Sequence, residues 1–346
     1  MSLGSAHPPV APAGSTPAAS GRGAQAAARI VRSGLAPAVL AWVCVGLLVL
    51  VASSMIDGFL TMPSIRSVLA LTAILGIAAA GQTIVVIMGG IDLSIPALMT
   101  LTAVAINEFT GRGWNIVVLL IMLAVACIAI GALNGLLSSF FRVHPLIITL
   151  GVGFMVSGGL LAWTQGKPEG SVPRFLTDAT AAASTMGPIP LQPLVAVWAA
   201  VALVTIVMAT RTPFGRRVYA YGSSARAAEY ALVRPRRLWV GVFAFSGLTA
   251  FVAGVMLAGF TGYGDLRAGD PYLFNTVAAV ILGGTSLLGG RGGYGRSIAG
   301  SLMLILAQLI LVSQGVEQAT QQVALGALVV VLVAIYGRDL HVRDRV

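Results

Sequence analysis

The chain has 346 residues, of which 57% are hydrophobic and only 9% are charged. In soluble domains roughly a quarter of all residues are charged, so this composition excludes an ordinary soluble protein. The formal net charge of +10 does not indicate nucleic-acid binding, because the basic residues fall in short loops between apolar runs and not on one folded face. We therefore expect an all-α polytopic membrane protein, surrounded by the lipid bilayer and without a nucleic-acid partner.

The two ends of the chain differ from its middle. Residues 1–34 are rich in Ala, Gly, Ser and Pro, which predicts a disordered cytoplasmic tail. A cleaved signal peptide is the alternative, but the apolar run over 35–55 has nearly the length of a full span. Residues 35–337 are predicted to form the transmembrane domain, and 338–346 a short cytoplasmic tail.

Apolar runs of near-spanning length follow one another through the transmembrane domain, and about ten spans are expected, some of them broken or re-entrant. The expected spans are 36–55, 66–88, 94–108, 115–140, 145–164, 190–210, 238–260, 272–289, 297–314 and 319–336. An even number places both termini on one side of the membrane. With the termini inside, 16 of the 21 Lys and Arg residues fall on the cytoplasmic side, as the positive-inside rule requires.

Two loops stand out by their length. The outer loop, 165–190, is rich in proline and long enough to meet an extracytoplasmic partner. The inner loop, 211–237, carries seven arginines and a single acid, Glu229. Within it, 225–233 has the pattern of a short amphipathic helix at the membrane surface.

Asp92 lies between two apolar runs, and a carboxylate inside a membrane is costly enough to suggest a function. The neighbouring Gly89, Gly90 and Pro96 indicate a broken or re-entrant backbone. Alternatively, Asp92 together with Ser94 caps the start of the third span. The two roles are compatible.

The stretch from Gly81-Gln82-Thr83 to Asp92-Leu93-Ser94 resembles a signature of the ribose-type sugar permeases of ATP-binding-cassette (ABC) importers. The stretch 278–292, with its Gly-Gly-Thr-Ser and Gly-Gly-Arg-Gly phrases, resembles a second signature of that family, in the same order and spacing. The resemblance covers 36–337. It implies a permease subunit that imports a sugar or similar small polar solute. It also implies a second permease copy or paralogue, a cytoplasmic ABC ATPase and a periplasmic or extracellular solute-binding protein as partners.

The chain itself is not expected to be an enzyme. Its only Gly-Lys pair, Gly166-Lys167, is followed by Pro168 and lacks the upstream glycine of a phosphate-binding loop. ATP and Mg are therefore assigned to the partner ATPase, and no cofactor is expected to bind directly. The three histidines and two cysteines lack the spacing of a catalytic or metal site, so neither kind of site is predicted.

The resemblance implies that the inner loop docks onto the ATPase through a Gly-Arg phrase, an aromatic-rich turn and an Ala-Ala helix. The coupling residues so implied are Arg216, Arg217, Gly222, Arg226, Ala227, Ala228 and Glu229. Small alanines permit close approach, and the arginines can pair with acidic groups of the partner. The alternative is that the arginines only set the topology.

Two positions depart from the family pattern. Leu232 stands where the family usually has glycine after the Ala-Ala helix, which leaves the geometry of that turn in question. Pro96 replaces the glycine that typically follows the Asp-Leu-Ser phrase, and proline is well tolerated in the first turn of a helix.

A set of polar and glycine residues in the two signatures is predicted to line the translocation path or its gate. The set is Gln82, Asp92, Ser94, Asn275, Gly283, Gly284, Thr285 and Ser286. Asn134 and Thr149 are further polar candidates. Amide and hydroxyl groups suit a sugar, but the same groups also serve hydrogen bonds between helices, so packing is the alternative for each. For the glycines the alternatives are close backbone approach and a gating bend.

Two other transport functions compete with this hypothesis. A secondary transporter driven by H⁺ or Na⁺ usually keeps several ionisable groups at mid-membrane depth, and Asp92 is the only such candidate here. A related ABC permease for nucleosides or branched amino acids is closer, because those families share the general architecture.

Overall fold

The computed structural model describes residues 35–186, 192–317, 319–324, 326–327 and 330. These residues form helices and no β-strand, which confirms the all-α prediction. The predicted tails, 1–34 and 338–346, lie outside the described residues, as does half of the expected span 319–336. All packing described below lies within the compact unit Ala38–Val346.

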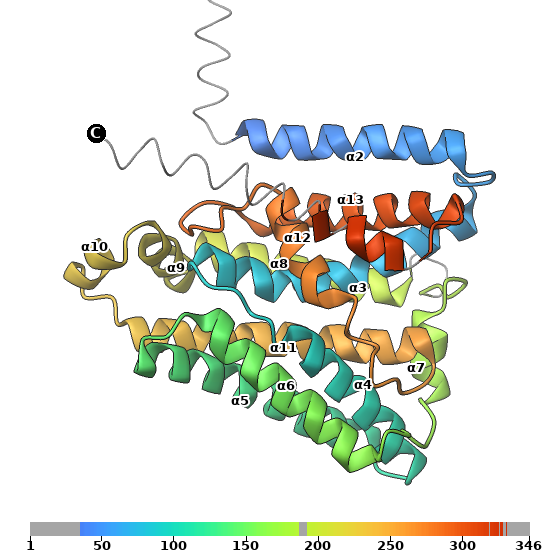
Figure 1. Ribbon diagram of the computed structural model, residues 1–346, viewed down its shortest axis with the longest axis horizontal. Coiled ribbons are helices and arrows are strands. Elements are labelled where there is room, and N and C mark those ends of the chain that lie inside the picture. The colour runs from blue at the N-terminus through green and yellow to red at the C-terminus, as the bar shows by residue number, and fades with distance from the viewer. Residues whose placement is uncertain (1–34, 187–191, 318, 325, 328–329, 331–346) are drawn as a thin grey trace, which may run out of the picture. The chain divides into compact units, whose positions relative to one another are not determined.

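The helices are, in chain order along the ribbon of Figure 1, α2 (Leu35–Met55), α3 (Met62–Ile87), α4 (Ile95–Gly111), α5 (Ile116–Phe141), α6 (Pro145–Thr164), α7 (Arg174–Thr180), α8 (Pro193–Arg211), α9 (Pro213–Ser223), α10 (Ala225–Tyr230), α11 (Pro235–Thr261), α12 (Tyr272–Leu282) and α13 (Tyr294–Ser313). Among the described residues, six helices are long and apolar enough to cross a membrane: α3, α5, α6, α8, α11 and α13. A polytopic helical membrane protein is thus confirmed. The span number of about ten is not confirmed, since α4 and α12 have only 17 and 11 residues.

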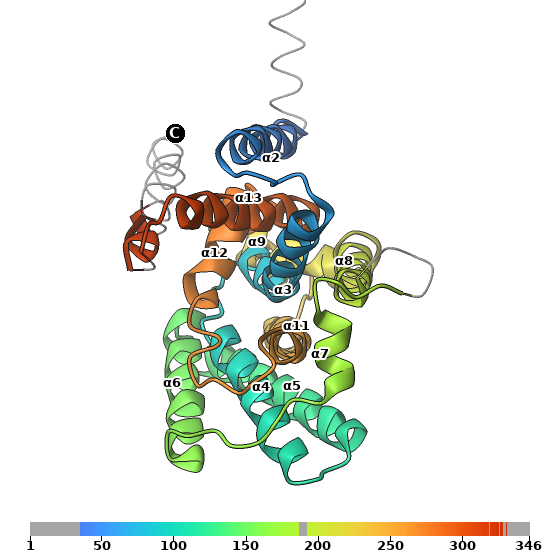
Figure 2. The ribbon, with the colours of Figure 1, turned by 90° about the vertical axis from the view of Figure 1, so that its right-hand side faces the viewer.

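Helices α3 and α11 form the centre of the packing. Figure 2 shows α3 beside α13, α8 and α11, while α11 packs most extensively along α5 and also along α4. In the most apolar stretch of α3, 94% of the residues are buried, against 22% for α5. The outward side of α5 is apolar and suits lipid, whereas polar groups on α3 face other helices.

The predicted break around Asp92 is present. Helix α3 ends at Ile87, and Gly89 follows with a φ of 89°, a left-handed conformation that glycine adopts without steric cost. Helix α4 begins only at Ile95, with Pro96 in its first turn. The segment between the two helices is irregular and enclosed by other helices, as a break at membrane depth must be.

The prediction of one continuous helix over 272–289 is wrong. Helix α12 ends at Leu282, and Gly284 has a φ of 79°. The loop 283–293 leads from there into α13. Left-handed glycines stop the helix here for the same reason as in the first signature. Both family signatures therefore contain a helix that breaks at a Gly-Gly pair.

The inner loop is more helical than the sequence indicated. The prediction of an aromatic-rich turn after Gly215 is wrong, because these residues belong to helix α9. Thr212 caps this helix, its hydroxyl accepting a hydrogen bond from the Gly215 N–H at 3.2 Å. The short helix expected over 225–233 exists as α10 but ends at Tyr230.

Leu232 explains that early end, because its φ is 60°. This is the left-handed conformation that the family's glycine adopts easily and that costs a leucine roughly 1–2 kcal/mol. Its side chain is 89% exposed, so little packing compensates. The doubt that the sequence raised about this turn is thus resolved: the turn has glycine-like geometry with a leucine in it.

Replacing Leu232 with glycine is expected to raise the free energy of unfolding by up to about 1 kcal/mol, because relief of the left-handed strain exceeds the extra chain entropy of glycine. The midpoint of thermal unfolding of the purified protein measures this. Ala231→Gly is the matched control, since Ala231 has a φ of −82°, and it is expected to lower the midpoint. Equal loss of stability in both variants would contradict this explanation.

Candidate functional site

Buried polar side chains from five segments of the chain meet at the break between α3 and α4. They come from α3, the break itself, α5, α6 and α11. We call this group the polar hub; its members are Gln82, Asp92, Ser94, Asn134, Thr149 and Ser246. All six side chains are almost inaccessible to solvent. The hub therefore joins helices that are far apart in the sequence.

Asp92 is the centre of the hub. Its Oδ1 accepts hydrogen bonds from the backbone N–H of Ser94 at 2.9 Å and from the Ser94 hydroxyl at 2.6 Å. Its Oδ2 accepts from the Ser246 hydroxyl at 2.7 Å, across to α11. The Ser94 hydroxyl in turn accepts from the Asn134 amide at 2.9 Å, across to α5. These bonds satisfy both oxygens of the buried Asp92 side chain and fix the break against two neighbouring helices.

The expected capping role is present only in altered form. Ser94 occupies the N-cap position of α4, but its side chain makes no capping hydrogen bond. The Ser94 hydroxyl points instead to Asp92. Asp92 in turn accepts from the Ser94 N–H and not from an N–H in the first turn of α4. Asp92 thus stabilises the chain just before α4, while its second oxygen serves a contact between helices.

The remaining hub members bind the backbone of the break. The Gln82 side-chain oxygen accepts from the Asp92 N–H at 3.3 Å, and the Thr149 hydroxyl accepts from the Leu93 N–H at 3.0 Å. These side chains replace the helical hydrogen bonds that the break removes. Within the described residues, the Gln82 side-chain nitrogen and the Asn134 side-chain oxygen are buried without a partner. The Gln82 amide nitrogen and the Asn134 amide oxygen are therefore the polar groups of the hub whose hydrogen-bonding capacity is unused.

Small residues let α11 approach the hub. A β-carbon at Gly81 would lie 2.6 Å from the Cα of Ser246, and one at Gly135 would lie 2.7 Å from the carbonyl carbon of Trp239. The packing expected of the small-residue pattern around Asn134 is therefore present. Asn134 itself combines this packing position with a bond into the hub.

A second group of contacts joins both signatures to the inner loop. The Gly290 N–H donates to the Ile87 carbonyl oxygen at 2.8 Å, and Gly222, at the end of α9, lies against both atoms without room for a side chain. The Tyr219 hydroxyl donates to the Gly292 carbonyl oxygen at 3.0 Å. We call this group, Ile87, Tyr219, Gly222, Gly290 and Gly292, the glycine junction. It connects α9 directly to the end of α3 and to the loop after α12.

The Tyr219 hydroxyl keeps its proton in this junction. Burial raises the pKa of the Tyr219 phenol, and the positive charge of Arg296 opposes that shift only in part. The hydroxyl consequently remains a hydrogen-bond donor to the loop at neutral pH.

The structure separates the predicted path residues into groups. Gln82, Asp92 and Ser94 belong to the polar hub. The residues of the second signature do not reach it: Gly283 packs against the backbone of α13, and the buried Thr285 accepts from the Gly293 N–H at 3.4 Å. The neighbouring Gly284 and Ser286 lie in the same loop, where the Ser286 N–H donates to the Arg291 carbonyl oxygen at 3.0 Å. Asn275 is buried on α12.

The predicted coupling residues also divide by their exposure. Those on the outer surface of α9 and α10 are Arg216, Arg217, Arg226, Ala227 and Glu229. Ala228 is only 3% exposed and packs within the chain, so Ala227 is the alanine available to a partner. Gly222 faces inward and belongs to the glycine junction.

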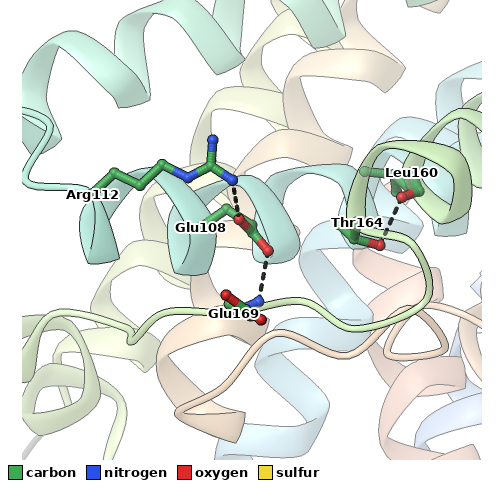
Figure 3. A network of polar contacts seen from close by, with 5 residues as sticks. All are labelled: Glu108, Arg112, Leu160, Thr164 and Glu169. Atoms are coloured by element: carbon green, nitrogen blue, oxygen red, sulfur yellow. Dashed lines mark hydrogen bonds and ion pairs between the residues drawn. The ribbon is translucent and has the colours of Figure 1, made fainter.

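Two functional candidates were not found from the sequence. Ser246 lies in an apolar run, where a single serine gives no signal. Glu108 is the other: it is only 4% exposed, binds Arg112 at 2.8 Å and accepts the Glu169 N–H through its second oxygen at 2.6 Å. Figure 3 shows this carboxylate between α4 and the outer loop. The i,i+4 spacing of Glu108 and Arg112 could have indicated their ion pair. The hydrogen bond to Glu169 could not be predicted, because the two residues are far apart in the sequence.

Glu108→Gln is expected to loosen the outer loop by about 1–2 kcal/mol, because a neutral amide loses the ion pair with Arg112 and weakens the bond to the Glu169 N–H. Hydrogen exchange of the amides over 166–172 measures this, and faster exchange is expected there. Glu169→Gln serves as the control, since only its backbone N–H is bonded to Glu108. Unchanged exchange in Glu108→Gln would show that the carboxylate does not hold the loop.

The comparisons with known proteins agree with this architecture. Residues 64–333 match the family model described as branched-chain amino acid transport system / permease component. The chain is 32% identical to the ribose import permease protein RbsC of Bacillus subtilis over 290 residues, which cover 84% of this chain and 88% of that protein. It is 30% identical to RbsC of Escherichia coli K12, over 75% of this chain and 82% of that protein. It is also 30% identical to the fructose import permease protein FrcC of Rhizobium meliloti, over 76% of this chain and 74% of that protein.

No solved structure matches the chain. The family model spans most of the transmembrane part, and the relatives align along most of their own lengths. The resemblance to ribose-type sugar permeases is thereby confirmed. This chain belongs to the family of branched-chain amino acid transport system permease components.

Proposed function

We propose that this chain is the transmembrane permease subunit of an ABC importer and moves a sugar or similar small polar solute across the bacterial inner membrane. The observation that carries the proposal is the glycine junction. Through it, Gly222 at the end of α9 contacts the end of α3 and the loop after α12 at the same place. A displacement of α9 and α10 therefore acts directly on both broken helices.

The proposed partners follow from the exposed surfaces and from the names of the relatives. The outer surface of α9 and α10 offers Arg216, Arg217 and Arg226 around the small Ala227, which suits an acidic cleft of a separate ATPase subunit. That ATPase would use the ATP and Mg, and this chain would bind neither. A solute-binding protein would dock on the opposite side, and a second permease copy or paralogue would complete the path. The termini would be cytoplasmic, as the distribution of basic residues supports.

The polar hub favours a neutral solute. Its open groups are one amide nitrogen, on Gln82, and one amide oxygen, on Asn134, which together suit hydroxyl groups. None of the six hub residues carries a positive charge that could pair with the carboxylate of an amino acid, and both oxygens of Asp92 already accept hydrogen bonds within the hub. Two of the aligned relatives are named for ribose and fructose import. A sugar is therefore favoured over the branched-chain amino acids in the family's description.

The proposed mechanism is alternating access driven by the partner. Closure of the ATPase subunits would move α10 and α9, and the glycine junction would pass this movement to the end of α3 and the 283–293 loop. Helices on the two sides of the Asp92 break would then shift relative to each other. The hub holds these helices together in the arrangement described above.

Solute uptake by cells tests the proposed substrate class. The chain would be expressed with an ABC ATPase and a solute-binding protein from its own genome, in a host that lacks its own carriers for ribose, fructose and leucine. Uptake of a radiolabelled sugar, without competition by excess leucine, is expected. Accumulation of leucine in place of either sugar would contradict the sugar proposal and favour an amino-acid permease.

A further inference from the structure

An open cavity of about 1490 Å³ lies outside both the hub and the glycine junction. One wall is the turn between α5 and α6, and the other is the segment from the end of α10 to the start of α11. Its lining includes four arginines, Arg142, Arg234, Arg236 and Arg237, together with His144 and the acid Glu229. We call this space the basic cavity. Two segments about 90 residues apart in the sequence therefore bring four arginines together around one opening.

The positive charge of the basic cavity has little compensation among the residues that the structure describes. In the part that the structure describes, none of its four arginines forms an ion pair, and Glu229 is the single acid in the lining. Arg236 lies over the Phe140 ring at 5.3 Å, which orients its guanidinium at the cavity wall. Helices α6 and α11 also begin at this cavity, with Pro145 and Pro235, and helix N-termini add positive potential. Such a site selects an anion.

The surroundings of the cavity indicate what kind of anion. Phe140 lines the cavity, and further large apolar side chains are exposed on the two helices that meet at its wall, α5 and α6: Leu133, Leu136, Phe141 and Ile147. Their helices belong to the weakly buried, outward-facing part of the bundle, where lipid chains are the natural neighbours. A molecule with an anionic head and apolar chains can use the arginines and this surface together. A water-soluble acidic peptide would use only the arginines.

We propose that the basic cavity binds the phosphate-bearing headgroup of an anionic phospholipid, with its acyl chains along α5 and α6. Arginine side chains bind phosphate oxygens in a bidentate manner and are less strongly hydrated than lysine, which suits a site at the membrane surface. A lipid in this place also touches the segment that follows α10. It would thus stabilise the part of the inner loop that the proposed ATPase contacts. The lipid site does not depend on which solute the protein carries.

Lipid retention by the purified full-length chain tests this proposal. Native mass spectrometry would measure the affinity for phosphatidylglycerol and for phosphatidylcholine with identical acyl chains. The wild-type chain is expected to prefer phosphatidylglycerol. The double variant Arg142→Gln/Arg237→Gln is expected to bind it about 30-fold more weakly, because two phosphate contacts are lost. Arg211→Gln/Arg291→Gln removes the same charge from exposed positions outside the cavity, and less than a threefold change is expected.

Other outcomes would overturn the proposal. Equal losses in the two double variants would mean that surface charge in general, and not the cavity, attracts the lipid. Displacement of the lipid by glycerol phosphate at the same concentration would identify a site for free phosphate compounds. Loss of ATPase assembly in the cavity variant, with lipid affinity unchanged, would assign the cavity to a protein partner.

A conservative variant keeps the test decisive if the glutamine variant fails to fold. Arg142→Lys/Arg237→Lys retains both charges but loses bidentate binding of phosphate. It is expected to weaken phosphatidylglycerol binding by several-fold, while binding of phosphatidylcholine stays the same. An unchanged preference in the lysine variant would contradict the assigned role of these two arginines.

Discussion

Replacing Gly222 with alanine is expected to uncouple ATP hydrolysis from uptake. The new β-carbon would overlap the Ile87 carbonyl oxygen and lie 2.7 Å from the Gly290 nitrogen, the two atoms that form the hydrogen bond at the glycine junction. Overpacking of this kind costs about 1–3 kcal/mol, so uptake by the assembled importer should fall by on the order of tenfold to a hundredfold. Uptake and ATP hydrolysis would be measured together in proteoliposomes.

Gly295→Ala is the matched control for this experiment. Gly295 lies in the first turn of α13, and nothing stands within 4 Å of the position that its β-carbon would take. Uptake by this variant is expected to remain at the wild-type level. Normal coupling in Gly222→Ala, in a protein that assembles with its ATPase, would show that the junction does not transmit the movement.

Replacing Asp92 with alanine is expected to destabilise the protein strongly. The carboxylate accepts three hydrogen bonds, from the Ser94 N–H, the Ser94 hydroxyl and the Ser246 hydroxyl. Each buried donor left without an acceptor costs about 1–3 kcal/mol, so a total loss of several kcal/mol is expected. Asp92→Asn should cost less, because its amide oxygen still accepts and only part of the network is lost. Thermal unfolding of the purified chain would rank the two variants.

A double-mutant cycle separates the contact between Asp92 and Ser246 from the rest of the hub. Ser246→Ala is expected to cost clearly less in the Asp92→Ala background than in the wild type, because its partner is already gone. Asp57→Ala, at an exposed position between α2 and α3, should leave stability unchanged within about 0.5 kcal/mol. Additive effects of Asp92→Ala and Ser246→Ala would mean that the carboxylate does not hold α11.

The break before Asp92 was predicted from the sequence, whereas the break after Leu282 and the contacts that both breaks make were not. Gly89 and Gly90 signal a break because a left-handed residue ends a helix wherever it occurs. The same rule explains the end of α12 at Leu282, but apolar residues continue past Gly284 and their pattern extended the expected helix. Apolar composition alone does not distinguish a full span from a half-length helix.

The candidate site was predicted only in its local parts. Asp92 and Ser94 are two residues apart, so their association follows from the chain itself. Ser246 joins them from a helix more than 150 residues away, and a serine in an apolar run has no local signal. Gly222 was expected to take part in docking the ATPase on the inner loop. Its contacts with Ile87 and Gly290 instead involve three segments that only the fold brings together.

The most direct test of the importer hypothesis is uptake of a radiolabelled sugar into proteoliposomes that contain this chain, its ATPase and its binding protein. We predict accumulation that requires ATP on the ATPase side and all three proteins, and that is unaffected by collapse of H⁺ and Na⁺ gradients. Uptake without ATP, driven by an imposed ion gradient, would contradict the account and identify a secondary transporter.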